Sequence, residues 1–200
     1  MSPNAKAPLP SEPANAPRRY RGPSIALHWL IAALIVVQLG LGWYMNEVVP
    51  DHSPAQERIE ALHIEFGLTL FVLVLVRVVA RLVWPAPRLP ADIAGWERVL
   101  AQSVHYLLYA LLIVIPLSGW ALVTTHHEPM SFWGLHWPSL PGLPTGPGAR
   151  SLSHLLKAWH IYWLIWAVVI AVGLHLAGAI KHQFDGHPVL WRMIPFLRKP

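Results

Sequence analysis

The stretch KAWHIYWLIWAVVIAVGLHLAGAIKHQF, residues 157–184, is almost wholly apolar apart from its histidines. About twenty such residues in a helix cross the ~30 Å hydrocarbon core of a bilayer. His160 and His175 lie fifteen residues apart in this stretch. Fifteen helical residues rise about 22 Å and turn about 60° beyond four full turns, so the two imidazoles share one broad face. The stretch therefore predicts one membrane helix with an imidazole near each end.

Three other apolar spans precede it, so the expected set is 24–45, 61–83, 99–123 and 156–180. Only 12% of the residues are charged, against about a quarter in soluble domains. The sequence therefore predicts an all-α integral membrane four-helix bundle over residues 24–184. Residues 1–23, rich in Pro and Ala, are expected to form a disordered cytoplasmic tail, and residues 185–200 a cytoplasmic C-terminal tail.

Composition excludes several kinds of site and partner. The chain has no cysteine, which excludes a disulfide, a thiolate metal site and an iron–sulfur cluster built from its own side chains. The net charge of +5 comes from basic residues that flank apolar runs. Because they form no patch with interleaved aromatic residues, we expect no nucleic-acid partner.

The distribution of lysine and arginine predicts the orientation in the membrane. Twelve of them fall on one side of the four spans and three on the other. The positive-inside rule then places both termini in the cytoplasm. The three residues on the outer side are Arg58, Arg150 and Lys157.

The orientation places the membrane histidines in two pairs of equal depth. His28 and His175 fall near the cytoplasmic surface, and His63 and His160 near the outer surface. Each pair comes from two different helices, as a haem with two axial imidazoles requires. One alternative is that these histidines only hydrogen-bond neighbouring helices. Another is a zinc site, which is less suited because zinc takes four ligands at one depth.

Three other residues lie at cytoplasmic depth. His105 is a candidate third imidazole, a partner of a haem propionate or part of a quinone pocket, with a plain interfacial role as the alternative. Lys181 and His182 are candidates for propionate or quinone contact, with lipid headgroup contact as the alternative. Arg77 and Arg81 are expected to extend to the headgroups.

Further expectations concern loops and glycines. Outer-loop residues His126, His127 and His136 offer a weak metal site or, more simply, a solvated loop. Glycines within the spans leave room for close helix packing or for a flat macrocycle. These glycines are Gly40, Gly42, Gly67, Gly119, Gly173 and Gly178.

Four segments together resemble the bacterial cytochrome b561 family. They are RYRGPSIALHWL, LHIEFGLTLFVLVLVRVVARL, SVHYLLYALLIVIPLSGW and the stretch quoted first. The resemblance covers about residues 18–184. It implies a bacterial inner-membrane four-helix bundle with two haem b groups, whose axial ligands are His28, His63, His160 and His175. It also implies electron exchange with the quinone pool, and one relative is a superoxide oxidase that passes electrons to ubiquinone.

The resemblance leaves three functions open. The first is a stand-alone oxidoreductase between an outer donor, such as superoxide, and ubiquinone. The second is a cytochrome b anchor subunit for a periplasmic redox partner such as a hydrogenase, and the third is a haem-free bundle. Superoxide is disfavoured by the acidic first outer loop and favoured by Arg150 and Lys157. The acidic residues are Glu47, Asp51, Glu57 and Glu60.

Overall fold

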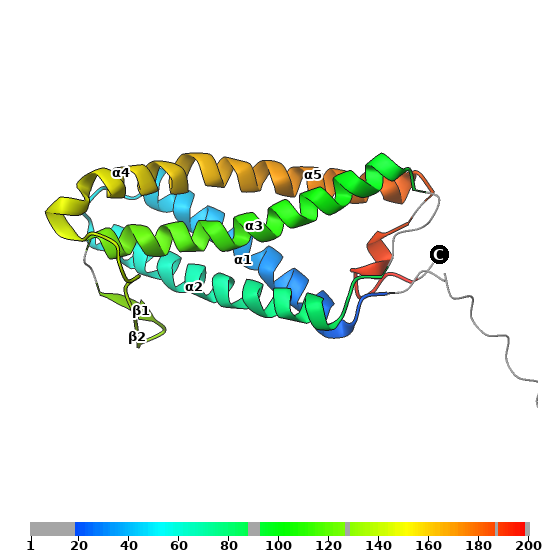
Figure 1. The fold of residues 1–200 in the computed structure, drawn as a ribbon, viewed down its shortest axis with the longest axis horizontal. Coiled ribbons are helices and arrows are strands. Elements are labelled where there is room, and N and C mark those ends of the chain that lie inside the picture. The colour runs from blue at the N-terminus through cyan, green and yellow to red at the C-terminus, as the bar shows by residue number, and fades with distance from the viewer. Residues whose placement is uncertain (1–18, 88–92, 127–128, 187, 199–200) are drawn as a thin grey trace, which may run out of the picture.

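The computed structural model describes residues 19–87, 93–126, 129–186 and 188–198. Four long helical runs lie lengthwise in one bundle, each with a stretch apolar and long enough to cross a membrane (Figure 1). The predicted all-α membrane four-helix bundle is confirmed. The runs are α1 (Gly22–Glu47), α2 (Pro54–Val83), α3 (Gly95–His126), and a last run of α4 (Arg150–Ala158), the π-helical turn η2 (Trp159–Leu164) and α5 (Ile165–Phe184).

The helices extend beyond the apolar spans because polar residues cap and begin them. At the start of α2, the Ser53 hydroxyl accepts a hydrogen bond from the Gln56 N–H at 3.2 Å. Pro54 occupies the first turn and Glu57 follows it, both favoured at a helix N-terminus. At the N-terminal end, α1 begins at Gly22. Residues 1–18 of the expected tail lie outside the described residues.

Two apolar clusters hold the middle of the bundle. One joins α1 to α2 through buried residues such as Ile31 and Val74. The other joins α3 to the last helical run through residues such as Leu111 and Val168. Leu112 of α3 packs against both clusters, so α3 links the two halves. Elsewhere, large apolar side chains face outward, as expected for surfaces in contact with lipid.

The connection between α3 and α4 contains a hairpin that the sequence analysis did not predict. Strands β1 (Met130–Phe132) and β2 (Leu135–Trp137) pair antiparallel. The turn residue Trp133 has φ 51°, a left-handed conformation that is rare outside glycine. Its ring packs edge-on against Phe66, and its Nε1–H donates to the Thr69 hydroxyl at 2.9 Å. These contacts with α2 hold the hairpin against the bundle.

The C-terminal residues pack back onto the end of the bundle where α1 begins. The short helix η3 (Leu190–Arg192) buries Trp191 and Arg192. The Tyr20 N–H donates to the Arg192 carbonyl at 3.3 Å, and Trp29 Nε1–H donates to the Met193 carbonyl at 2.8 Å. The segment 188–194 therefore ties the end of the last helix to the beginning of α1.

Candidate functional site

His63 of α2 and His160 of η2 face each other at the hairpin end of the bundle. Their ring centroids are 6.1 Å apart and their planes are inclined at 81°. Both imidazoles line a cavity of about 90 Å³, which Met130 of the hairpin also lines. The rest of the wall is mostly aliphatic. A largely apolar lining with a few polar groups is typical of ligand and cofactor pockets.

Two glycines leave space for these imidazoles. A Cβ on Gly42 would lie 3.5 Å from His63 Cε1, and a Cβ on Gly119 would lie 3.1 Å from His160 Cε1. At these two positions the small residue makes room for an imidazole, because each ring packs against the glycine backbone of a neighbouring helix. Apart from its chain neighbours and its own helix backbone, no atom of the described residues lies within 4 Å of a Cβ built on Gly40, Gly173 or Gly178.

His160 has a hydroxyl partner from α3. Its Nδ1 lies 2.8 Å from Ser118 Oγ, and that hydroxyl donates to the Ile115 carbonyl at 2.7 Å. Sequence analysis missed Ser118. The available signal was its position inside an apolar span, where uncharged polar residues usually bond across helices.

Gln38 supports the backbone of His63. Its amide Nε2 donates to the His63 carbonyl at 3.0 Å, and a Cβ on Gly67 would lie 2.8 Å from that nitrogen. Among the described residues, neither Gln38 Oε1 nor His63 Nδ1 has a hydrogen-bond partner, although both are buried. Buried polar atoms normally have partners, so hydrogen-bonding capacity remains at this cavity. Gln38 too was missed from the sequence.

His28 of α1 and His175 of α5 form the second pair, at the opposite end of the bundle. Their centroids are also 6.1 Å apart, with planes inclined at 66°. α1 and α5 make few close backbone contacts, so the two imidazoles face each other between helices that are not tightly packed. The structure thus brings together the same two pairs that depth alone predicted.

Arg77 turns inward toward this second pair. Its Nη1 donates to the Ser24 carbonyl at 2.9 Å, and its Nη2 lies 3.3 Å from His28 Nδ1. The expectation that Arg77 extends to the lipid headgroups is therefore wrong, because the part-buried Ser24 carbonyl and the His28 imidazole offer it partners. Arg81, one turn later, lies over the Tyr20 ring at 5.7 Å.

His105 lies beside the His28–His175 pair. Its ring centroid is 4.9 Å from that of His175, with the planes nearly perpendicular at 87°. Its Nδ1–H donates to the Ala101 carbonyl at 2.5 Å. The structure therefore places a third imidazole at this end, as the sequence suggested.

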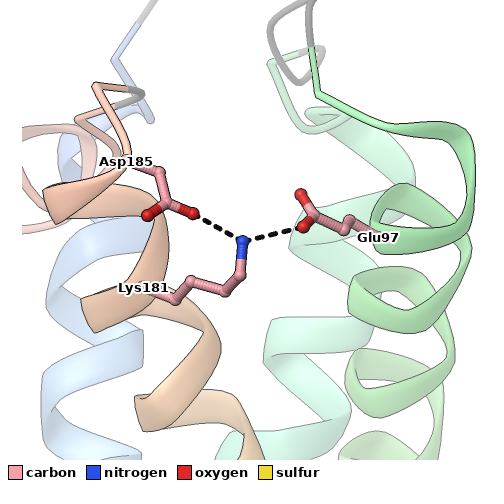
Figure 2. Close-up of polar contacts among 3 residues, drawn as sticks. All are labelled: Glu97, Lys181 and Asp185. Atoms are coloured by element: carbon pink, nitrogen blue, oxygen red, sulfur yellow. Dashed lines mark hydrogen bonds and ion pairs between the residues drawn. The ribbon is translucent and has the colours of Figure 1, made fainter.

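Lys181 joins α5 to α3 through an ion-pair cluster (Figure 2). Its ammonium lies 2.7 Å from Glu97 Oε1 and 2.5 Å from Asp185 Oδ2. Two carboxylates therefore already surround this cation. The neighbouring His182 is buried, and within the described residues its Nδ1 has no hydrogen-bond partner.

The spacing of the two pairs suits one metal ion between each. An imidazole nitrogen lies about 2 Å from a bound metal, so two rings on opposite sides of one ion have centroids roughly 6 Å apart. Both pairs match at 6.1 Å, whereas His105 and His175 are closer at 4.9 Å. Across the described ranges, no group of three or more His, Cys, Asp and Glu side chains is arranged for a metal ion.

The outer-loop histidines are apart from both pairs. His126 ends α3, and its Nε2 lies 2.7 Å from Ser153 Oγ. His136 belongs to β2, and His127 lies outside the described residues.

A π-helical turn changes the angular relation between His160 and His175. The turn η2 contains His160, at the start of the fifteen-residue interval. A π turn has i→i+5 hydrogen bonds, so each of its residues turns less than the 100° of an α-helix. The surplus of about 60° predicted for a regular helix is therefore reduced, which brings the two imidazoles closer to one face. Such turns are frequent at functional sites.

Comparison with known proteins identifies the family of this chain. The sequence profile described as prokaryotic cytochrome b561 matches residues 19–196. Cytochrome b561 homolog 2 of Escherichia coli is 31% identical over 181 residues, covering 90% of this chain and 93% of that protein. The probable superoxide oxidase CybB of Yersinia pestis is 24% identical, covering 89% and 97%. The predicted resemblance is confirmed: the chain belongs to the prokaryotic cytochrome b561 family.

Proposed function

We propose that the protein carries electrons across the membrane on two haem b groups, one held by His63 and His160 and the other by His28 and His175. The observation that carries this proposal is the repeated separation of 6.1 Å in two imidazole pairs at opposite ends of the bundle. Membership of a cytochrome b family supports haem b as the cofactor. When bound, haem supplies one-electron chemistry that imidazoles alone lack.

The chain's own residues bind, orient and shield the cofactors. The four imidazoles supply neutral nitrogen ligands, and aliphatic side chains around the outer pair exclude water. His160 and His175 belong to one continuous helical run, so a single element fixes the spacing between the two sites. That spacing, about 22 Å along the axis, suits transfer from one side of the membrane to the other.

The cofactor count tests the proposal directly. Purified, detergent-solubilised protein should show a low-spin b-type visible spectrum and two haems per chain by the pyridine haemochrome assay. A ratio near one after full reconstitution would contradict the two-pair scheme, and a colourless protein would favour the haem-free bundle.

The proposed orientation places both termini and the His28–His175 pair at the cytoplasmic face, because basic residues concentrate there. The absence of native cysteine makes labelling specific. In intact cells, Ser139→Cys should react with an impermeant maleimide, whereas Pro195→Cys should react only after lysis. The reverse pattern would overturn this orientation.

Superoxide is the proposed outer donor and ubiquinone the proposed acceptor. Oxidation of two superoxide ions to O₂ would supply the two electrons that, with two protons, convert ubiquinone to ubiquinol. Two observations support the pair: a relative is named probable superoxide oxidase, and Arg150 and Lys157 add positive charge at the outer end. Superoxide-driven ubiquinone reduction by the purified protein should exceed that of the His63→Ala variant, and equal rates would exclude this donor.

His182 and His105 are the proposed residues at the quinone end. Within the described residues, His182 Nδ1 has no hydrogen-bond partner, and the His105 ring lies beside that of His175. A histidine can deliver a proton near neutral pH. His182→Ala should keep both haems but slow oxidation of the reduced protein by a ubiquinone analogue in stopped flow. An unchanged rate would exclude a role for His182.

A second function is supported by the exposed tip of the hairpin. Trp133 and Leu135 are 51% and 68% exposed at the outer end, where a periplasmic redox enzyme could dock. Affinity purification from mild detergent would then recover a stoichiometric large subunit, whereas recovery of the cytochrome alone would favour the stand-alone oxidoreductase.

A further inference from the structure

The Ser118 hydroxyl connects the backbone of α3 to the imidazole of His160. Its oxygen lies 2.7 Å from the Ile115 carbonyl and 2.8 Å from His160 Nδ1. All three residues are partly buried within the membrane span. Water therefore competes little for these groups, and the short chain of bonds is an intrinsic part of the site.

The two contacts fix the position of a proton on the imidazole. A carbonyl oxygen can only accept, so the single hydroxyl proton of Ser118 is committed to Ile115. Ser118 Oγ must then accept from His160, which places the ring proton on Nδ1 and leaves the lone pair on Nε2. This is the tautomer that binds a metal through Nε2.

We propose that Ser118 is a positioning residue for the outer haem: it holds His160 in the Nε2-ligating tautomer and fixes the orientation of its ring. The inference deepens the proposed function and rests on His160 being an axial ligand. Gly119 also supports this ring, because a Cβ built on Gly119 would lie 3.1 Å from His160 Cε1. Adjacent residues of α3 therefore fix both the proton and the plane of one imidazole.

The π-helical turn makes such external support necessary. η2 departs from regular α-helical hydrogen bonding where His160 projects, so the ring's direction is less determined by its own helix. α3 contacts η2 directly. A serine that only bonded back to its own helix, at the i−3 carbonyl, would have no effect on His160, and this difference can be measured.

When Ser118 accepts a hydrogen bond from His160 Nδ1–H, the imidazole also becomes a stronger electron-pair donor to iron through Nε2. A more basic ligand stabilises the ferric state and thereby lowers the reduction potential. Loss of such a partner typically weakens metal retention about 10- to 100-fold. Ser118 should therefore affect the outer haem alone.

The test compares Ser118→Ala, Ser118→Thr and Ser118→Val in the full-length haem-loaded protein. Threonine and valine have nearly the same shape, so they differ chiefly in the hydroxyl. Ser103→Ala, an exposed serine at the far end of α3, is the matched control. The readouts are low-spin EPR g-values, midpoint potentials, and the rate of haem transfer to apomyoglobin.

We expect Ser118→Ala and Ser118→Val to raise the outer midpoint potential, alter one EPR signal and release the outer haem about 10- to 100-fold faster. Ser118→Thr and Ser103→Ala should behave as wild type. The unchanged inner haem signal reports a folded bundle; if Ser118→Ala fails to fold, the threonine–valine comparison decides. Identical properties of the Thr and Val variants would overturn the proposal.

His160→Ala in the same series separates this inference from the proposed function. If His160→Ala keeps both haems, the ligand assignment fails. If it loses the outer haem while the Thr and Val variants of Ser118 remain identical, only the positioning role fails.

Discussion

Around His63 and His160, the nearest described partners are glycine backbones, a glutamine amide and a serine hydroxyl. Around His28 and His175 they are the guanidinium of Arg77, the imidazole of His105 and the indole of Trp29, whose ring lies 5.4 Å from that of His28. The outer pair is thus supported by small neutral groups. The inner pair lies among large side chains, one of them cationic.

The difference extends to hydrogen bonding. At the outer end, Ser118 accepts from His160 Nδ1. At the inner end, Arg77 can only donate, so its contact with His28 Nδ1 requires that nitrogen to accept. Ligation of His28 through Nε2 would place a proton on Nδ1, and Arg77 would then retain its bond to the Ser24 carbonyl and act on the site through its charge.

These surroundings predict an order of reduction potentials. A nearby cation disfavours the ferric state, which carries one more positive charge than the ferrous state, and so raises the inner potential. An accepted hydrogen bond at His160 lowers the outer potential. Electron transfer from the His63–His160 site to the His28–His175 site is therefore expected to be downhill.

The largest effect is expected from removal of the imidazoles themselves. His63→Ala and His160→Ala should each lose the same haem, and His28→Ala and His175→Ala should each lose the other, because neither site can be reached across about 22 Å. Haem content and EPR of the four variants give the pairing. His154→Ala, an exposed histidine of α4, should keep both haems. Loss of one shared species in the His28 and His63 variants would refute the pairing.

Enlarging a glycine should affect only the outer pair. Gly119→Val adds a Cβ 3.1 Å from His160 Cε1, and overpacking of this kind typically costs about 1–3 kcal/mol. Faster release of the outer haem, with the inner spectrum intact, is the expected result. Gly40→Val, on an exposed surface with no described atom near its Cβ, serves as control. Equal effects at the two positions would show that helix packing, rather than the ring contact, decides.

Neutralising Arg77 should affect only the inner pair. Arg77→Gln removes a charge 3.3 Å from His28 Nδ1 and should lower the inner midpoint potential by roughly 40 mV, or on the order of 1 kcal/mol for one electron. Redox titration with optical detection separates the two sites. Arg81→Gln, one turn away over Tyr20, should shift it less. An unchanged inner potential in Arg77→Gln would remove the electrostatic basis for the expected order.

The smallest effect is expected at the exposed ion-pair cluster of Figure 2. Lys181→Gln should keep both haems and the quinone rate and lower the melting temperature slightly, since exposed ion pairs contribute little. High salt should reduce that difference. Lys157→Gln, which has no ion pair in the described part of the chain, provides the baseline. A slower quinone reaction in Lys181→Gln alone would instead support a contact between Lys181 and the quinone, which the sequence analysis gave as one candidate role.

The apolar spans and the histidine pairs were predictable because both depend on position along the helix axis. Hydropathy locates each span, and the distribution of lysine and arginine predicts which end of each span faces the cytoplasm. His28 and His175 could therefore be matched by depth alone. Rotation about the axis was less predictable. The π turn at His160 and the inward direction of Arg77 depend on neighbouring helices, which the sequence pattern of one helix does not describe.

The hairpin was missed for a related reason. Its two strands have three residues each, and its turn residue is a tryptophan rather than the usual Asn or Gly. Its stability comes from contacts with Thr69 and Phe66 on a distant helix. Ser118 and Gln38 could have been found by searching the spans for uncharged polar residues, but their partners could not.

The contacts of the C-terminal segment with Tyr20 and Trp29 have a consequence for biosynthesis. The ribosome makes residues 188–194 after all four membrane helices, so these hydrogen bonds form only when the bundle has been inserted. Until then, α1 and α5, which make few close backbone contacts, remain free to separate at this end of the bundle. We expect cofactor loading between them to precede docking of this segment, which would make it the last step of maturation.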